Sequence, residues 1–251
     1  MSEAELHEAI AGHRWLQSLR ISRDLVTSGA MPEARLLAEE SALLDPLNLT
    51  GAHVLEVGAA NGFFSFAARR RGAARVVATD HLAWTLPGAD ALSATQWAAH
   101  ALGLEVETMA LDPRGLSPNF GSFHVVLATA FFEQIFNPIQ ALRGLRRVTN
   151  RVLLLETLQD ELADARPMMT AQSRIMPFGG VDGSWIVGWA PNPPLMLQLL
   201  LELGFNRVLY RDHPTLGPAR GIYAALLPEA PDGLLAGFET PWLNMTSPPA
   251  G

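Results

Sequence analysis

The first fifty residues carry hydrophobic positions at roughly helical spacing. Between residues 2 and 19 the apolar positions among polar ones are Leu6, Ile10, Trp15, Leu16 and Leu19. This pattern predicts an amphipathic helix over 2–19 that must cover another part of the protein. A second helical pattern, 32–44, has proline in its first turn and stops before Asp45-Pro46, so we expect a second helix there.

Beyond residue 50 the hydrophobic pattern changes to short runs rich in Val, Leu and Ile. Strands are predicted at 53–57, 75–79, 104–108, 123–129, 151–156, 205–211 and 221–227. Helical patterns lie between most of them, at 62–71, 90–102, 138–148 and 193–203. This alternation indicates an α/β fold with right-handed crossovers and a mostly parallel seven-stranded sheet with helices on both faces. The last two strands are joined by "DHPTLGPARG" and are short enough to form a hairpin at one edge.

One long segment, 157–190, breaks the alternation between the fifth strand and the next helix. Loops of this length in compact domains are usually functional or disordered, and the aromatic residues of this one argue for order. We therefore expect an insertion on the substrate side of the fold. The tail from Pro228 is rich in proline and is predicted to be extended, with mobile last residues.

The composition favours a single domain. A chain of 251 residues that is 49% hydrophobic and 17% charged can bury a full core, and no low-complexity linker divides it. We expect one domain over 1–251, with a helical cap at 1–50, a core at 51–228 and an extended tail at 229–251. The N-terminal segment is acidic and no run of eighteen apolar residues occurs, which predicts a cytoplasmic protein without signal peptide or membrane span.

Charge and missing residue types remove several chemistries. The formal net charge is −7, which disfavours a broad electrostatic footprint for nucleic acid. The sequence has no cysteine, so disulfides, thiolate metal sites and cysteine nucleophiles are excluded. It also has no lysine, which excludes Schiff-base chemistry, and its abundant Ala, Gly, Pro and Arg are typical of a GC-rich bacterial genome. No His/Asp/Glu cluster has ligand spacing, so we expect no metal.

The turn after the first predicted strand reads "EVGAANG", from Glu56 to Gly62. Gly58 allows the chain to turn sharply, and Gly62 allows a ligand or the sheet to approach the backbone closely. The dinucleotide fingerprint G-x-G-x-x-G fails here, because position 60 is alanine and position 63 is phenylalanine. A second acidic residue, Asp80, ends the next strand. The alternative is a tight strand–helix turn beside a solvated aspartate.

An acidic residue before two glycines spaced four apart, with Asp80 after the second strand, resembles the class I S-adenosylmethionine-dependent methyltransferases. The stretches "LLDPLNLTGAHVLEVGAANGFF", "FHVVLATAFFEQIFNPIQALRG" and "GSWIVGWAPNPPLMLQLLLELGFNRV" resemble one subgroup, which includes bacterial tRNA wobble-uridine carboxymethyltransferases and small-molecule methyltransferases. The resemblance covers roughly residues 13–228. It implies a Rossmann-like methyltransferase fold, and its motifs are specific for the cofactor rather than for the acceptor.

The resemblance also implies a set of cofactor contacts. The turn residues around the methionine and ribose parts of S-adenosylmethionine would be Glu56, Gly58, Ala59, Ala60, Asn61 and Gly62. Asp80 would hold the ribose, because a carboxylate accepts hydrogen bonds from both hydroxyls. The adenine would lie between His81 and Trp84, with Asp112 at its amino group. Residues near the transferring methyl would be Ala128 and Thr129. The alternatives are a surface histidine at 81 and a core aromatic at 84.

The chain departs from the tRNA-modifying members after the fourth strand. Their tyrosine-histidine pair is replaced by Glu133 and Gln134. That tyrosine helps to recognise the extra carboxylate of a carboxylated cofactor, which a glutamate would repel, so we expect S-adenosyl-L-methionine, with S-adenosyl-L-homocysteine as product. Glu133 is the leading candidate for a general base, if the acceptor must lose a proton, and His213 and Asp182 are weaker ones. A surface carboxylate is the alternative at 133.

Candidate acceptor contacts come from Gln134 and from the insertion. Arg174 would anchor an acidic group of the acceptor, or be a solvated arginine. An adaptable apolar wall, or plain core, would be formed by Met168, Met169, Met176, Phe178, Trp185 and Trp189. Asn192 precedes Pro193-Pro194, which predicts first a helix cap and second a substrate contact.

Three functions are compatible with these residues. The first is methyl transfer from S-adenosylmethionine to an oxygen, nitrogen or carbon of a small molecule, in secondary metabolism. The second is modification of a tRNA base, which needs one basic face formed by Arg69, Arg70, Arg71, Arg143, Arg146 and Arg147. The third is a non-methylating reaction, or a role as a partner subunit, on the same fold.

Overall fold

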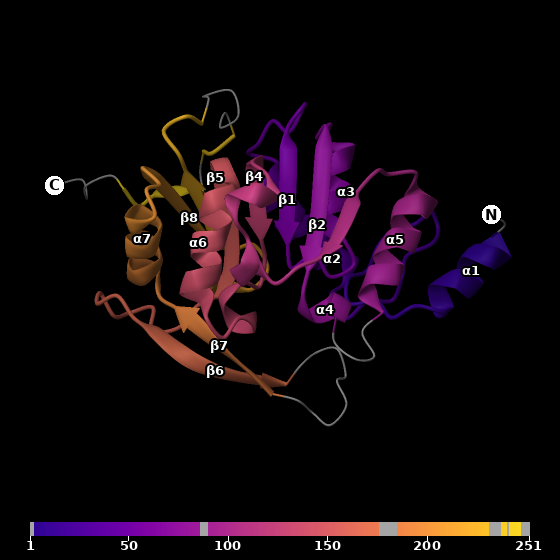
Figure 1. The fold of residues 1–251 in the computed structure, drawn as a ribbon. Helices are drawn as coiled ribbons and strands as arrows, with labels where there is room; N and C mark the ends of the chain where they lie inside the picture. The colour runs from indigo at the N-terminus through magenta and orange to yellow at the C-terminus, as the bar shows by residue number, and fades with distance from the viewer. Residues whose placement is uncertain (1–2, 86–89, 176–184, 231–236, 240, 247–251) are drawn as a thin grey trace.

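The computed structural model describes residues 3–85, 90–175, 185–230, 237–239 and 241–246 (Figure 1). The helices are α1 (Glu3–Ala11), α2 (Glu33–Leu44), α3 (Phe63–Arg70), α4 (Leu82–Thr85), α5 (Ala91–Leu102), α6 (Pro138–Val148) and α7 (Pro193–Glu202), with 3-10 turns η1 (Pro113–Gly115), η2 (Pro118–Phe120) and η3 (Phe132–Gln134). The strands are β1 (His53–Val57), β2 (Arg75–Asp80), β3 (Glu107–Ala110), β4 (Phe123–Ala128), β5 (Thr149–Leu158), β6 (Met169–Ile175), β7 (Trp185–Pro191), β8 (Arg207–His213), β9 (Gly217–Leu226) and β10 (Leu243–Asn244).

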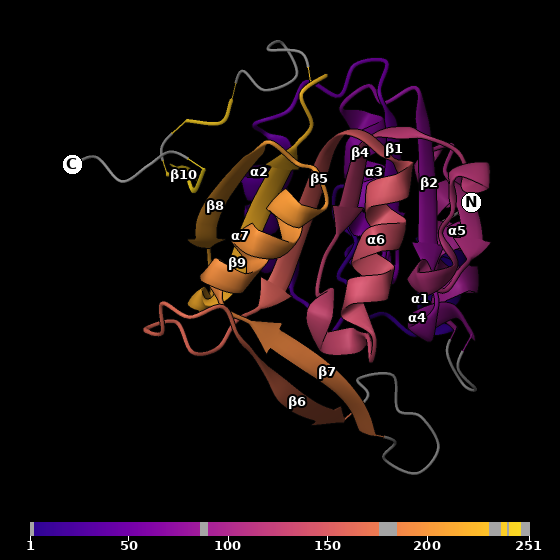
Figure 2. The same ribbon diagram turned by 60° about the vertical axis from the view of Figure 1, so that its left-hand side comes forward.

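The central sheet has the order β10-β8-β9-β5-β4-β1-β2-β3 (Figure 2). The strands β3, β2, β1, β4 and β5 are parallel, whereas β9 runs antiparallel to β5 and β8. The predicted Rossmann-like α/β fold is therefore confirmed. Within the described residues the sheet has eight strands rather than seven, because the tail adds β10 to β8. For the same reason the predicted terminal hairpin, β8 and β9, does not itself form the edge.

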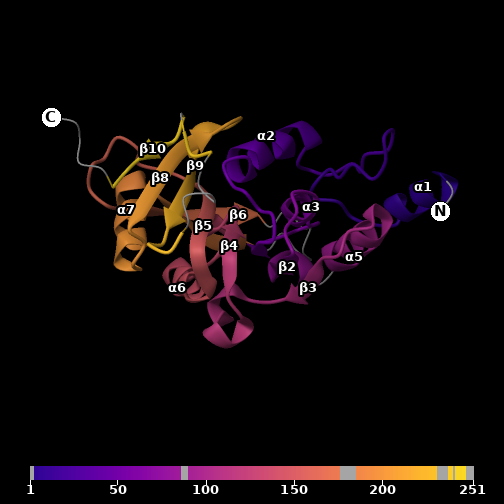
Figure 3. The same cartoon turned by 90° about the horizontal axis from the view of Figure 1, so that it is seen from above.

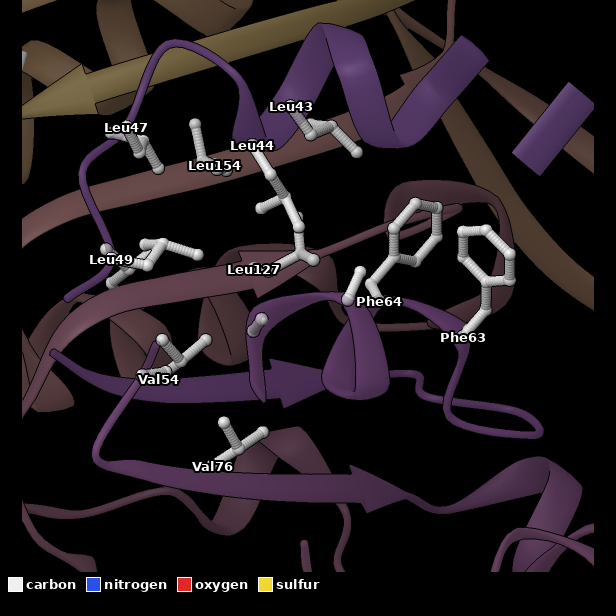
Figure 4. Packing of buried hydrophobic residues seen from close by; sticks show 14 of the residues in the cluster. Leu43, Leu44, Leu47, Leu49, Val54, Phe63, Phe64, Val76, Leu127 and Leu154 are labelled. Carbon is white, nitrogen blue, oxygen red and sulfur yellow. The ribbon is translucent and has the colours of Figure 1, made fainter. Parts of the chain in front are cut away.

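Helices cover both faces of the sheet (Figure 3). One hydrophobic cluster joins α2, α3 and α5 to one face through residues such as Leu43, Phe64 and Ala98. Figure 4 shows part of this cluster, with Leu44 lying above Leu127 of β4. The second cluster joins α6 and α7 to the other face. The burial of both faces explains why β1, β4 and β5, in the middle of the sheet, contain continuous apolar runs.

Most element boundaries follow local signals in the sequence. β1 and α6 have the predicted bounds, and α6 begins where the Asn137 side chain accepts a hydrogen bond from the Gln140 amide, with proline next. The third strand is shifted, since 104–108 was predicted and β3 is Glu107–Ala110. Gly103 ends α5 with φ of +64°, and the amide of Leu104 then bonds the Ala99 carbonyl. Leu104 thus belongs to a helix-terminating motif and packs on the core instead of starting the strand.

The predicted helix over 2–19 is wrong in its second half. α1 ends at Ala11, and the chain up to α2 is extended and irregular, with isolated bridges between Gln17 and Met31 and between Arg20 and Val26. The amides of Leu16 and Gln17 bond the side chain of Asn61. The apolar residues after Gly12 therefore face the core from an extended segment that is held by a distant side chain.

Most of the described residues of the segment 157–190 form regular strands rather than an irregular loop. β5 continues to Leu158, and β6 and β7 form an antiparallel two-stranded sheet of their own. Residues 176–184 lie outside the described residues. Figure 2 shows this hairpin projecting beyond the central sheet, below the ends of β4 and β5.

Candidate functional site

A cavity of about 440 Å³ opens at the carboxyl ends of the parallel strands. Its walls are Val57, Gly58, Asp80, His81, Leu82, Leu111, Asp112, Pro113, Arg114, Thr129, Ala130, Phe131, Gln134, Ile135 and Phe136. The strand order reverses between β1 and β4, and ligands of open parallel sheets bind at this kind of switch point. The volume is in the range of small-molecule sites.

The glycine turn forms one wall of this cavity through Gly58. Gly58 and Gly62 have φ of +82° and +84°, which L side chains rarely adopt. A Cβ at Gly62 would also lie 3.0 Å from Cγ2 of Thr95, so a side chain here would require Thr95 to shift as well. Ala60 has φ of +50°, a left-handed conformation that strains a residue with a Cβ.

Asp80 lies at the end of β2 and lines the cavity. Its Oδ2 accepts a hydrogen bond from the Ala60 amide at 2.9 Å, and its Oδ1 accepts one from the Ala83 amide at 2.8 Å. Burial raises the pKa of Asp80 although these amides stabilise the ionised form. The carboxylate is therefore fixed beside the glycine turn and still reaches the cavity.

Glu56 lies behind the turn rather than among the residues that line the cavity. Its Oε2 accepts hydrogen bonds from the amide and the hydroxyl of Ser65, at 2.8 and 2.5 Å. Its Oε1 is buried and has no hydrogen-bond partner in the described structure. Burial raises the pKa of Glu56 to about 8. Glu56 is therefore held behind the glycine turn by Ser65, with one buried oxygen that has no partner among the described residues.

The predicted adenine contacts fall in different places. His81 and Asp112 line the cavity, with Nε2 of His81 3.9 Å from Oδ2 of Asp112. Both Asp112 oxygens also bind Arg114, whose guanidinium lowers the pKa of Asp112. Trp84 is buried in a small cluster behind the glycine turn, and its Nε1 donates to the Ala60 carbonyl at 2.7 Å. Trp84 therefore occupies the position of a core aromatic, which was the alternative to an adenine contact.

Three other residues of the predicted cofactor set are buried behind the cavity. Ala59 and Ala128 are fully buried in the core, and Thr129, next to Ala128, reaches the cavity instead. Asn61 points to the N-terminal segment, where Oδ1 accepts from the Leu16 and Gln17 amides. In return, Oε1 of Gln17 accepts from the amides of Asn61 and Phe63 at 3.1 Å.

Glu133 and Gln134 differ sharply although they are neighbours. Gln134 lines the cavity. Glu133 is 1% exposed and pairs with Arg220, which also binds Glu156. Glu133 also accepts hydrogen bonds from the Thr157 hydroxyl and the Leu158 amide. Its position therefore matches neither a surface carboxylate nor a base that faces the cavity.

The weaker base candidates lie elsewhere. His213 is buried, and its Nε2 is 2.6 Å from Oε1 of Glu39 on α2. Its Nδ1 accepts hydrogen bonds from the Thr215 and Leu216 amides, so both ring nitrogens are engaged in joining α2 to β8. Asp182 lies outside the described residues.

The acceptor-side candidates are only partly brought to the cavity. Trp189 donates from Nε1 to the carbonyl of Phe136, a residue of the cavity wall, at 2.9 Å. Asn192 caps α7 as predicted, because its Oδ1 accepts from the Leu195 amide at 3.1 Å. It also accepts from the Met168 amide.

Several predicted residues of the insertion have no described side chain. Arg174 and Trp185 are placed by their backbones alone, opposite Ile186 and Ile175 in the hairpin. Met176 and Phe178 lie outside the described residues. Met169 pairs with Pro191 at the other end of the hairpin.

Several residues of the site were not predicted from the sequence. Phe131, Ile135 and Phe136 line the cavity, and their place directly after the fourth strand was a usable signal. Arg220 gave no local signal, because it reaches the site from β9. Gln17 also gave none, since its contact with the glycine turn spans more than forty positions.

The described residues contain no group of His, Asp and Glu arranged to hold a metal. Among the helices that the structure describes, none combines the length and apolar character needed to span a bilayer. The six arginines considered for a nucleic-acid face are divided between α3 and its end, on one side of the sheet, and α6, on the other (Figure 3).

Comparison with known proteins relates the fold to one class. No protein-family model and no curated protein sequence matches the chain. The N-terminal domain of EvdMO1, crystallised in the presence of S-adenosylhomocysteine and D-fucose, is similar over 90% of this chain and 97% of its own, with 14% identity and a TM-score of 0.69.

Two further structures show the same fold. An S-adenosylmethionine-dependent methyltransferase from Mesorhizobium loti is 17% identical over 75% of this chain and 97% of its own, with a TM-score of 0.57. Magnesium protoporphyrin IX methyltransferase from Synechocystis PCC 6803, with bound S-adenosylmethionine, is 16% identical over 77% of this chain and 78% of its own, with a TM-score of 0.55. The chain therefore has the fold of class I S-adenosylmethionine-dependent methyltransferases.

Proposed function

We propose that this protein binds S-adenosyl-L-methionine and transfers its methyl group to an oxygen, nitrogen or carbon atom of a small molecule. The observation that carries the proposal is the carboxylate of Asp80, which lines the cavity at the switch point and is fixed against the glycine turn by two amides. Similar folds in the solved structures hold S-adenosylmethionine or S-adenosylhomocysteine.

Each wall of the cavity has a distinct part in this proposal. Asp80 would accept hydrogen bonds from both ribose hydroxyls, and Gly58 allows close approach of the ligand to the backbone. His81 and Asp112 would lie at the adenine. Asp112 would then bind the adenine amino group either together with Arg114 or in place of it. Thr129 and Ala130 would lie beside the sulfonium end. When bound, the cofactor supplies an electrophilic methyl group, so the protein mainly aligns the acceptor and excludes water.

The sequence predicted Glu133 as the leading candidate for a general base, and its surroundings in the structure argue against that role. Glu133 is held by Arg220, Thr157 and Leu158, so its carboxylate is committed to a buried network. Gln134 reaches the cavity and would contact the acceptor or the cofactor by hydrogen bonds. We propose that orientation of the acceptor dominates and that a base from Glu133 is not used.

The acceptor is proposed to be a small molecule of secondary metabolism, which would enter between the cavity and the β6–β7 hairpin. The Mesorhizobium and Synechocystis proteins have the same fold, and the second is named for a porphyrin substrate. A tRNA acceptor is disfavoured by the division of the arginines over two sides of the sheet, together with the net charge of −7. The same two observations disfavour the tRNA-modifying part of the subgroup that the chain resembles.

Titration calorimetry with S-adenosylhomocysteine tests the proposal. We expect one site per chain, and a folded protein that gives no binding would reject it. Product mass then separates methyl transfer from a non-methylating reaction, because methylation adds one methylene to the acceptor. Salt-sensitive binding of tRNA would instead support the RNA alternative.

A further inference from the structure

A buried ionic cluster of three side chains lies behind the cavity wall that follows β4. Arg220 of β9 binds Glu156 of β5 through Nε and Nη2, and binds Glu133 of η3 through Nη2. The side chains of Arg220, Glu133 and Glu156 are 8%, 2% and 3% exposed. Two carboxylates share one guanidinium here, and both carboxylates raise the pKa of Arg220 despite its burial.

The two glutamates hold the segment that follows β4. The Ala130 amide donates to Oε2 of Glu156 at 2.9 Å, and the Phe131 amide donates to the Glu156 carbonyl at 3.2 Å. The Phe132 amide donates to the hydroxyl of Thr157 at 3.2 Å, and that hydroxyl donates to Glu133 at 2.9 Å. The three consecutive amides of residues 130–132 are thus held by hydrogen bonds to residues of β5.

This segment needs support because it is strained. Ala130 has φ of +52°, which is unfavourable for a residue with a Cβ. Thr129, Ala130 and Phe131 all line the cavity. A small shift of the segment would therefore move the wall that faces a bound ligand.

The same network reaches the β6–β7 hairpin. A Cβ at Gly188 of β7 would lie 2.1 Å from the carbonyl oxygen of Glu133, so the two backbones are in direct contact. Trp189 adds a hydrogen bond to the Phe136 carbonyl. The short segment 130–136 therefore forms part of the cavity wall and also contacts the β6–β7 hairpin on the acceptor side.

We propose that Arg220 is a positioning residue that fixes both the post-β4 cavity wall and the β6–β7 hairpin through its two glutamates. The proposal rests on the proposed function, since the wall is the one expected at the sulfonium end. Arginine suits the position because its planar fork binds two carboxylates in fixed directions, which a lysine ammonium does not. Without the guanidinium, two buried carboxylates would be left facing each other.

The test compares Arg220→Lys with wild type, using calorimetry with S-adenosylhomocysteine and amide hydrogen exchange. We expect at least tenfold weaker binding and at least tenfold faster exchange at 130–132 and in β7. Exchange at Gly58 and Ala59, whose amides bond the Thr79 carbonyl, should be unchanged. Arg207→Met, on an exposed position of β8, is the matched control and should match wild type in both measurements.

A uniform loss of protection across the whole sheet would overturn the proposal, because it would show a general stabilising role. Affinity within twofold of wild type in folded Arg220→Lys would also overturn it. If that variant does not fold, Glu133→Gln replaces it, since it keeps the pair of Arg220 with Glu156. We then expect faster exchange at Phe132 and Leu158 and at least threefold weaker binding, and no change in either would overturn the proposal.

The two claims fail in different ways. If wild type does not bind S-adenosylhomocysteine, the proposed function is rejected, while the exchange of 130–132 and β7 still tests the positioning role. If wild type binds and Arg220→Lys behaves like it, the proposed function stands and the role of Arg220 is rejected.

Discussion

The two walls of the cavity are built in different ways. The wall from β1 and β2 comes from one short stretch of chain, in which Gly58 and Ala59 bond the Thr79 carbonyl and Asp80 bonds the amides of Ala60 and Ala83. The wall after β4 depends on Arg220, which lies 64 and 87 positions from the two glutamates that it binds. The local wall leaves a motif in the sequence, whereas the contacts of Arg220 that hold the other wall join distant elements and leave none.

The largest effect is expected from breaking the distant wall. Arg220→Met removes the guanidinium and leaves two buried carboxylates unpaired, so the free energy of unfolding should fall by about 3–5 kcal/mol. Urea unfolding measures the change. Arg166→Met is the control, because the pair with Asp164 is on the surface and its loss should leave the unfolding midpoint unchanged. A loss below about 1 kcal/mol in Arg220→Met would contradict the account.

Substitutions in the wall from β1 and β2 should lower the affinity for the cofactor more than they lower the free energy of unfolding. Asp80→Ala removes the carboxylate that would bind the ribose, and hydrogen bonds to charged groups contribute about 1.5–3 kcal/mol. Affinity for S-adenosylhomocysteine should therefore fall by about 10–100-fold in calorimetry. Asp112→Ala should weaken binding less, since both its oxygens already bind Arg114. Equal losses in the two variants would show that the ribose contact is misassigned.

Glu56 gives the local wall a dependence on pH. Burial raises its pKa from 4.5 to about 8, so between these values the folded protein retains a proton that the unfolded chain releases. Stability should then fall as pH rises from about 4.5 to about 8, by at most about 1.4 kcal/mol per pH unit. Glu56→Gln removes the titrating group and keeps an acceptor for Ser65. Urea unfolding at several pH values should show a shallower decline in the variant, and parallel curves would refute the assignment.

The smallest effect concerns strain in the glycine turn. Ala60 has φ of +50°, which disfavours a residue with a Cβ by about 1–2 kcal/mol, while glycine loses about 0.5–1 kcal/mol through the entropy of the unfolded chain. Ala60→Gly should therefore stabilise the protein by up to about 1.5 kcal/mol, measured as a raised Tm. A clear loss of stability would mean that the methyl group of Ala60 makes a contact that outweighs the strain.

Much of the fold could be predicted because its signals are local. The strand of β1 and the helix of α6 were bounded correctly, since an apolar run and an Asn-Pro start define them. The helix expected over 2–19 was wrong beyond Ala11, because the side chains of Gln17 and Asn61 hold that segment in an extended form. The strands β6 and β7 were missed because 157–190 was interpreted as one insertion, whereas two stretches of it form a two-stranded sheet apart from the central one.

The same contrast between local and distant contacts applies to the residues of the site. The resemblance to class I methyltransferases implied Asp80, His81 and Asp112 as cofactor contacts, and all three line the cavity. Glu133 was correctly placed after β4, but its surroundings depend on Arg220 and Thr157, which no spacing rule connects to it. Trp84 lies behind the turn, because its indole donates to the Ala60 carbonyl and packs among alanines.

A crystal structure with S-adenosylhomocysteine tests the central claim most directly. The account predicts the ribose hydroxyls within hydrogen-bond distance of the Asp80 carboxylate, the sulfur facing Thr129 and Ala130, and the adenine beside His81. A ligand bound elsewhere, or one in this cavity with its ribose away from Asp80, would contradict the account.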